Sequence, residues 1–188
     1  MKYYVLHDFS SPAVAWGLRD PHLLGDTESC PPLGVGRRCS EEIQLEVELS
    51  REGQSVDYSY AGTTAPVLSC RALKAVESWL SESVQVLNVS VGSHRERFFL
   101  LNLLHRISAL DESRSKFEKY PPGHKVYDLD LSGRYRWVHD PIIDPSKVPE
   151  GVHIFRLFGF GVMIFVSEPL HDAMVAAKLT GAGFDPAF

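Results

Sequence analysis

Alternating apolar and polar side chains mark one part of the chain as strand. Residues 43–49 alternate Ile, Leu, Val and Leu with polar side chains, which is the period-two pattern of a strand with one buried face. Residues 51–55 are polar and turn the chain, and Val56, Tyr58 and Tyr60 then resume the alternation. The pattern predicts a β-hairpin with one face in water.

Four further segments have strand character. Residues 84–91 and 98–104 are rich in β-favouring side chains and are joined by a polar turn. The second of them, FFLLNLL, is apolar on both faces, which predicts a central strand covered on both sides. The opening run 1–7 and the alternating residues 127–131 complete the predicted sheet.

Two segments have the helical spacing of apolar residues. Ser69 stands where an N-cap belongs, and the apolar side chains within 72–80 share one face behind it. Ser167 stands at the start of the second helix, and Pro169 occupies its first turn, where a missing N–H costs little. Gly181 is placed to stop that helix in the left-handed conformation.

These elements predict an α+β fold, with two main helices packed on a mostly antiparallel sheet. Asp111 and Ser113 lie in a polar corner after the central strand and have side chains that favour turns. The length of 188 residues fits one domain, with 65–188 as its core and 1–64 as an N-terminal wrap and hairpin. Whether the first 60 residues share that core is left open.

Composition and charge exclude several classes of protein. With 44% hydrophobic residues the chain is expected to fold, and its net charge of -5 is small. The 19 Lys and Arg residues are scattered in pairs, which argues against a nucleic-acid partner. The start, MKYYVLHDF, lacks the pattern of a secretory signal, so a cytoplasmic location is expected. The apolar stretch 152–166 is shorter than the roughly 18 to 20 residues that span a bilayer, so no membrane partner is expected.

Metal and cofactor signals are weak. The three cysteines, Cys30, Cys39 and Cys70, are an odd number without a CxxC pair, which favours reduced thiols and no zinc site. The glycine-containing stretches 34–38 and 159–162 lack the remaining features of nucleotide-binding loops. We therefore predict no metal and no cofactor.

One loop collects residues that carry chemistry. Arg136, Trp137, His139, Asp140 and Asp144 lie close together in a segment punctuated by prolines. A small hydrolase or transferase using His139, Asp140 and Asp144 is one interpretation. Contact with a protein partner is another, because Trp and Arg also anchor interfaces. A scaffold that acts as a homo-oligomer is a third, and the oligomeric state is left open. Tyr135 and Trp137 share one strand face, and for them core packing is the favoured interpretation.

Four segments carry a family resemblance. They read APVLSCRAL, FFLLNLLHRISALDESRS, HIFRL and IFVSEPLHDAMVAAKLTGAGFDP, in this order from residue 65 onward. Their order and spacing resemble the bacterial polymorphic-toxin immunity family eleven, formerly a domain of unknown function. The resemblance covers roughly the last two-thirds of the chain, and the first 60 residues match less well.

The resemblance implies a protein that binds and neutralises a cognate toxin delivered by neighbouring bacteria. It implies no catalytic residue. Asp111, Ser113, Ser167 and Gly181 fit the family pattern as turn and cap residues that hold the fold. Because loops carry recognition on a rigid scaffold, the toxin is expected to contact the N-terminal region or the loop 132–150.

Overall fold

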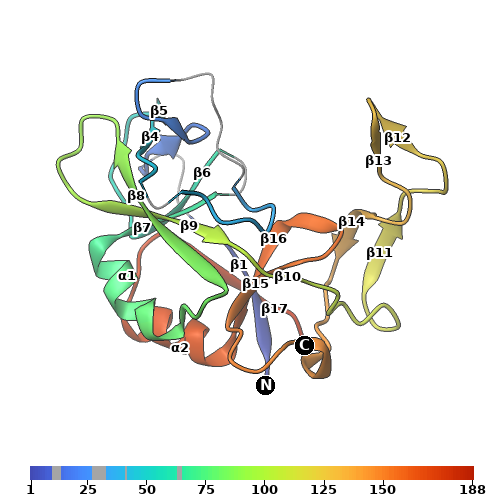
Figure 1. Cartoon of the computed structure of the whole chain (residues 1–188). Helices are drawn as coiled ribbons and strands as arrows, with labels where there is room; N and C mark the ends of the chain where they lie inside the picture. The colour runs from blue at the N-terminus through green and yellow to red at the C-terminus, as the bar shows by residue number, and fades with distance from the viewer. Residues whose placement is uncertain (10–13, 27–32, 41, 63–64) are drawn as a thin grey trace.

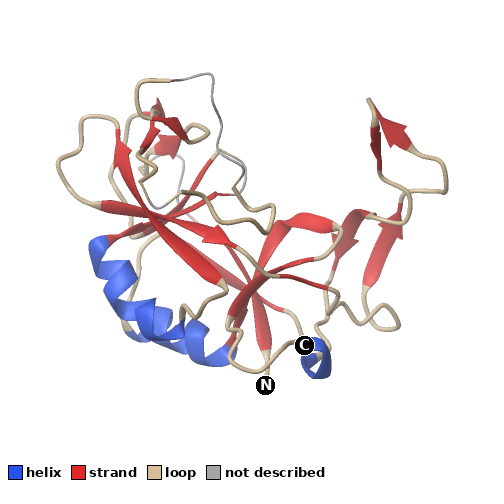
Figure 2. Ribbon diagram, viewed as in Figure 1, coloured by secondary structure: helices blue, strands red, loops and turns tan. Residues whose placement is uncertain are grey.

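Strands dominate the structure, which is a computed structural model that describes residues 1–9, 14–26, 33–40, 42–62 and 65–188. Strands account for 43% of the chain and helices for 13% (Figure 2). The strands form two larger sheets and two small two-stranded sheets.

One of the larger sheets joins the two ends of the chain. Its order is β10 (Arg106–Ile107), β15 (Ile154–Leu157), β16 (Phe160–Ser167), β1 (Tyr3–Asp8) and β17 (Ala182–Pro186). β1 pairs antiparallel with β16 on one side and with β17 on the other. The first strand of the protein is therefore held between strands from its C-terminal end (Figure 1).

The other larger sheet contains eight strands. Its order is β3 (His22–Leu23), β4 (Leu45–Val47), β8 (Val84–Val91), β9 (Phe98–Leu103), β7 (Ala65–Ser69), β6 (Tyr58–Ala61), β2 (Gly17–Leu18) and β5 (Leu49–Arg51). β9 pairs with β7 and β8, so the prediction of a central strand at 98–104 is confirmed. The small sheets pair β11 (Lys116–Lys119) with β14 (Tyr135–His139), and β12 (Lys125–Val126) with β13 (Leu129–Asp130).

Two α-helices and two short 3-10 helices complete the described elements. Helix α1 spans Cys70–Val76 and continues as the 3-10 helix η1, Glu77–Trp79. Helix α2 spans Glu168–Ala176, and the 3-10 helix η2 spans Pro145–Lys147. Helices α1 and α2 lie side by side against the strands (Figure 1).

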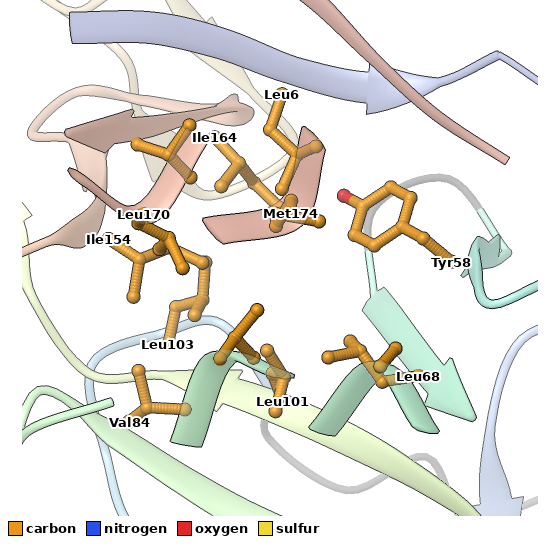
Figure 3. Close-up of a cluster of buried hydrophobic side chains, with 13 residues drawn as sticks. Leu6, Tyr58, Leu68, Val84, Leu101, Leu103, Ile154, Ile164, Leu170 and Met174 are labelled. Carbon is orange, nitrogen blue, oxygen red and sulfur yellow. The ribbon is translucent and has the colours of Figure 1, made fainter. Parts of the chain in front are cut away.

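The central core lies where the two larger sheets meet the helices. Figure 3 shows Leu6, Ile154 and Ile164 from the five-stranded sheet on one side of this core. Leu68 and Leu101 of the eight-stranded sheet lie on the other side. Leu170 and Met174 of α2 and Ala72 and Val76 of α1 belong to the same buried cluster. Burial of these apolar side chains is what holds the sheets together.

Two further clusters lie on the outer faces of the sheets. Phe155 and Phe165 of the five-stranded sheet pack with Leu110, Val138 and Ile143. On the eight-stranded sheet, buried side chains from the N-terminal region pack with others from β8 and β9; the members include Trp16, Leu18, Leu45, Val47, Ala61, Val89 and Leu100. The segment 14–62 therefore contributes buried side chains to the sheet that contains β9.

The predicted fold class is wrong. The protein is mostly β, its larger sheets are mixed, and its two α-helices are short, so it is not an α+β fold with two main helices on a mostly antiparallel sheet. Parallel pairs join β4 to β8, β2 to β6 and β10 to β15. The first helix is shorter than its apolar spacing suggested, because the segment after Val76 tightens into a 3-10 turn.

The predicted hairpin at 43–60 is also wrong. β4 pairs with β3 and β8, β5 pairs with β2, and β6 pairs with β2 and β7. Alternation reports which face of a strand is buried, and it says nothing about which strand lies beside it. β4 and β6 overlap the two predicted strands, but β5 extends into the predicted turn, and the three strands do not pair with one another.

Candidate functional site

The predicted partner-binding residues lie on or beside a projecting arm, which we define as residues 116–139. Its base is the ribbon, the antiparallel pair of β11 and β14 with Phe117 opposite Val138 and Glu118 opposite Trp137. The β12–β13 hairpin continues from the far end of the ribbon, and Figure 1 shows it standing away from the two larger sheets. The arm is therefore attached at one end only.

One face of the ribbon anchors the arm to the core. Val138 is buried, Phe117 is partly buried, and both belong to the cluster on the outer face of the five-stranded sheet. The rings of Phe117 and Tyr135 meet edge to face with centroids 5.4 Å apart. The backbone N–H of Tyr135 donates to the carbonyl of Gly159, at 3.2 Å, in the turn between β15 and β16. These contacts fix the direction in which the arm projects.

The other face of the ribbon displays Trp137 and Arg136. Trp137 is 42% exposed, and its Nε1 donates to Oε2 of Glu118 at 2.6 Å. Nη1 of Arg136 donates to the second oxygen, Oε1, at 3.0 Å. The bonds from Trp137 and then Arg136 lower the pKa of Glu118, so the carboxylate stays charged and holds both side chains. An exposed indole and an exposed guanidinium are thus oriented before any partner arrives.

His139 and Asp140 lie at the end of the same ribbon. Oδ2 of Asp140 accepts from Nζ of Lys116 at 2.8 Å, and Oδ1 lies 3.4 Å from Nε2 of His139. The bond from Lys116 lowers the pKa of Asp140. Asp140 has a left-handed backbone, with φ 49°, where the chain leaves the ribbon. These side chains form an exposed, charge-balanced group.

Asp144 has a different role in the structure. It is the N-cap of η2, and its Oδ1 accepts from the backbone N–H of Ser146 at 3.0 Å and from the hydroxyl of Ser146 at 2.7 Å. The oxygens of Asp144 and Asp140 therefore bond to different partners. Among the residues that the structure describes, no group of three or more His, Cys, Asp or Glu side chains could hold a metal ion.

Asp144 and Ser146 belong to a repeated turn, of which the sequence reasoning named only Asp111 and Ser113. In Asp111 and Ser113, in Asp130 and Ser132, and in Asp144 and Ser146, one carboxylate oxygen accepts both the backbone N–H and the hydroxyl of the serine two residues later. In each the hydroxyl bond is the largest cause of a lowered aspartate pKa. The spacing Asp-x-Ser was the signal that could have found them.

The two predicted N-caps differ in what their side chains do. Oγ of Ser69 accepts from the backbone N–H of Ala72 at 3.1 Å, a capping bond, and Oγ also donates to Asp57 at 2.8 Å. Ser167 stands at the N-cap position of α2 without a capping bond from its side chain. Its Oγ instead lies 2.7 Å from Nδ1 of His153, and burial lowers the pKa of that histidine. Ser167 is fully buried and is the last residue of β16, so the pair links the start of α2 to the residue that precedes β15.

The end of α2 also differs from the expectation. The chain reverses at Lys178, which has φ 50°, and the next residues bond back to the last turn of the helix. Gly181 has φ 85° but lies beyond this reversal, where its backbone packs against the carbonyl of Tyr58. Gly181 is therefore needed for a close approach of two segments, and Lys178 ends the helix.

A groove of about 660 Å³ lies beside the arm. Its walls include Glu112, Lys119, Tyr135 and Phe158. Oε1 of Glu112 accepts from Nζ of Lys119 at 2.6 Å and from the hydroxyl of Tyr135 at 2.5 Å. Burial and the bond to Glu112 raise the pKa of Tyr135. These bonds join Glu112, on one side of the groove, to Lys119 and Tyr135 at the base of the arm.

Comparison with known proteins identifies the family. A comparison with individually curated proteins finds no match. No helix in the described part of the chain is long and apolar enough to cross a membrane. The model of the immunity protein family Imm11 matches residues 15–188, so the match includes most of the N-terminal region where the resemblance was expected to be weak. This match spans nearly the whole sequence, and the chain belongs to the Imm11 immunity protein family.

Proposed function

We propose that this protein binds a cognate toxin and neutralises it without chemistry of its own, protecting a bacterial cell from its competitors. Membership of an immunity protein family supports a toxin partner. We expect the complex to form in the cytoplasm, where a delivered toxin would act. Its contact surface is the exposed face of the ribbon.

The main support for this contact surface is that Trp137 and Arg136 bond to the same carboxylate, that of Glu118. Interfaces are dominated by a few buried aromatic and arginine anchors, and a side chain that is already oriented loses less entropy on binding. Trp137 and Arg136 are exposed and already oriented by bonds of 2.6 and 3.0 Å to that carboxylate. His139 and Asp140 extend the same surface, while Asp144 positions the turn behind it.

Truncation of the indole tests the surface. We expect Trp137→Ala to weaken binding of the purified toxin domain encoded beside this chain by about 100-fold, because the central anchor of the contact is removed. Isothermal titration calorimetry measures the change, and co-expression with the active toxin reports whether growth is still rescued. Phe188→Ala is the matched control, since Phe188 is 51% exposed and lies at the C-terminus.

Three outcomes decide the proposal. A loss of binding with Trp137→Ala, and not with Phe188→Ala, supports the ribbon as the contact surface. Wild-type affinity in both variants rejects the ribbon while leaving a toxin partner in place. A wild-type protein that neither binds the toxin nor rescues growth overturns the proposed function itself.

A further inference from the structure

The tip of the arm has features that the fold does not use. We infer that the tip, which is formed by Val126, Tyr127 and Leu129, inserts into a concave apolar pocket of the toxin. This inference rests on the proposed function and adds a second contact to it, at the free end of the arm beyond the ribbon (Figure 1).

Tyr127 stands at the most exposed point of the hairpin. Val126 pairs with Leu129, so Tyr127 and Asp128 form a two-residue turn. The backbone of Tyr127 has φ 52°, the left-handed region that a bulky side chain rarely adopts and that glycine adopts without strain. Asp128 does not share this positive φ, and a two-residue turn of that kind favours glycine at its first position. A tyrosine here is unfavourable for folding.

No contact within the described part of the chain compensates for that tyrosine. Its side chain is 99% exposed, so it contributes no buried area to the core. Val126 is 43% exposed and Leu129 is 53% exposed, and the two face each other across the hairpin. The hairpin therefore gathers three apolar side chains in water at its outermost point. Strained residues that local packing does not explain are concentrated at functional sites.

The hairpin is held rigidly at its base, which favours binding. Oγ of Ser132 accepts from the backbone N–H of Gly123 at 2.8 Å and donates to Oδ1 of Asp130 at 2.6 Å. The rings of Tyr120 and His124 stack with centroids 4.6 Å apart. Because the base is ordered already, inserting the tip into a pocket immobilises few additional groups.

The convex shape of the tip limits which kind of partner it can bind. A second copy of this chain would offer another convex tip to the first one in a symmetric contact, and two convex tips bury little area. A tip seated in a pocket of the next copy would repeat without closing and would form filaments. A projecting loop suits a concave site on a different protein. Under the proposed function that protein is the toxin.

The charges near the tip indicate an apolar pocket. Lys125 and Asp128 on the hairpin have opposite charges. The bonds from Ser132 and, less strongly, the charge of Arg134 lower the pKa of Asp130, so these two residues are also oppositely charged. With no net charge to steer it, the contact is expected to depend on buried area. Its affinity should therefore change little with salt.

The substitution Tyr127→Gly separates binding from folding. It removes the ring and places at φ 52° the residue that adopts this backbone without strain, so the fold is expected to be as stable as wild type or more stable. Calorimetry with the toxin domain encoded beside this chain should show binding at least about 30-fold weaker. Leu129→Ser is a second variant, expected to weaken binding without a change in the melting temperature.

The controls use residues outside the arm and a conservative change. Val175→Ala removes an apolar side chain that is 52% exposed on α2, and it should bind as wild type does. Tyr127→Phe keeps the ring and should retain most of the affinity. The titration is repeated at 50 and 500 mM salt. The ratio of the affinities of wild type and Tyr127→Gly should differ between the two salt concentrations by less than about a factor of two.

The outcomes distinguish this inference from the proposed function. Weaker binding by Tyr127→Gly and Leu129→Ser, with Val175→Ala unaffected, supports the inserted tip. Wild-type binding by both tip variants overturns it and leaves the proposed function standing, whereas no binding by the wild-type protein overturns both. A wild-type dimer that Tyr127→Gly converts to a monomer in sedimentation would show that a second copy covers the tip, and would also overturn the inference.

Discussion

At the scale of single residues, the end of helix α2 shows how position decides the role of a side chain. The N–H of Lys178 donates to the carbonyl of Val175 at 2.9 Å, and that of Leu179 donates to Met174 at 3.2 Å. This is the pattern in which a left-handed residue closes a helix, and glycine is its usual occupant. Lys178 holds that position with φ 50°, although a glycine follows three residues later.

Two substitutions at this turn should have opposite effects. Lys178→Gly should stabilise the fold by about 0.5–1 kcal/mol, because glycine adopts the left-handed backbone at no steric cost. Gly181→Ala should destabilise it by about 3 kcal/mol, since a Cβ there would lie 2.1 Å from the carbonyl oxygen of Tyr58. Urea denaturation measures both free energies of unfolding. The reverse order of stabilities would contradict this assignment of the helix end.

At the scale of elements, two buried amides connect an irregular segment to the eight-stranded sheet. Gln85 of β8 exchanges two hydrogen bonds of 2.8 Å with the backbone of Cys39. Asn102 of β9 accepts from the N–H of Gly34 at 3.0 Å and donates to the carbonyl of Arg37 at 2.8 Å. The segment 34–39 is thus held to the sheet by side-chain amides and not by pairing between backbones.

Removal of the amide of Asn102 should loosen this segment. Asn102→Leu keeps the size of the side chain but leaves two backbone groups without partners, so we expect a loss of about 3 kcal/mol. Hydrogen exchange should become faster at Gly34, and urea denaturation gives the free energy. Asn88→Ala, at an exposed position of β8, is the control and should change stability by less than about 0.5 kcal/mol. Unchanged exchange at Gly34 would reject the connection.

At the scale of the whole molecule, Asp57 joins segments that lie far apart in the sequence. Its carboxylate accepts from the guanidinium of Arg71, from the hydroxyl of Ser69 at 2.8 Å, and from the N–H and hydroxyl of Thr180, both at 2.9 Å. It therefore links the strand β6, the start of α1 and the turn before β17. Burial acts to raise the pKa of Asp57, but the bonds from Arg71, Thr180 and Ser69 together lower it to about 2.

This carboxylate should make the fold sensitive to acid. Because the pKa of Asp57 is lower in the folded state than its ordinary value of 3.8, its contribution is present above that value and is lost as the pH falls through about 2. The contribution is about 2 kcal/mol. We expect Asp57→Asn to be less stable than wild type at pH 6 and the difference to shrink between pH 4 and 2, as measured by thermal denaturation. A difference that is constant with pH would contradict this role.

Some elements could be predicted because their cause is local. The apolar run 98–104 indicated a central strand, and β9 lies between β7 and β8. Likewise Ser69 and Ser167 were read as N-caps from the residues beside them, and both stand at that position. What could not be predicted is pairing. The hairpin expected at 43–60 is three strands that do not pair with one another, because hydrogen bonds between strands join residues that the sequence keeps apart.

The candidate site also has features that the sequence could predict and features that it could not. The sequence by itself predicted a contact cluster at Arg136, Trp137, His139, Asp140 and Asp144, and four of its segments resembled the family to which the chain belongs. Only the tertiary structure brought Glu118 opposite Trp137 and raised the hairpin tip away from the core. The physical reason is that local patterns determine which side chains are buried or capped. Exposure and orientation depend on which distant segments pack together, and that is decided by the fold as a whole.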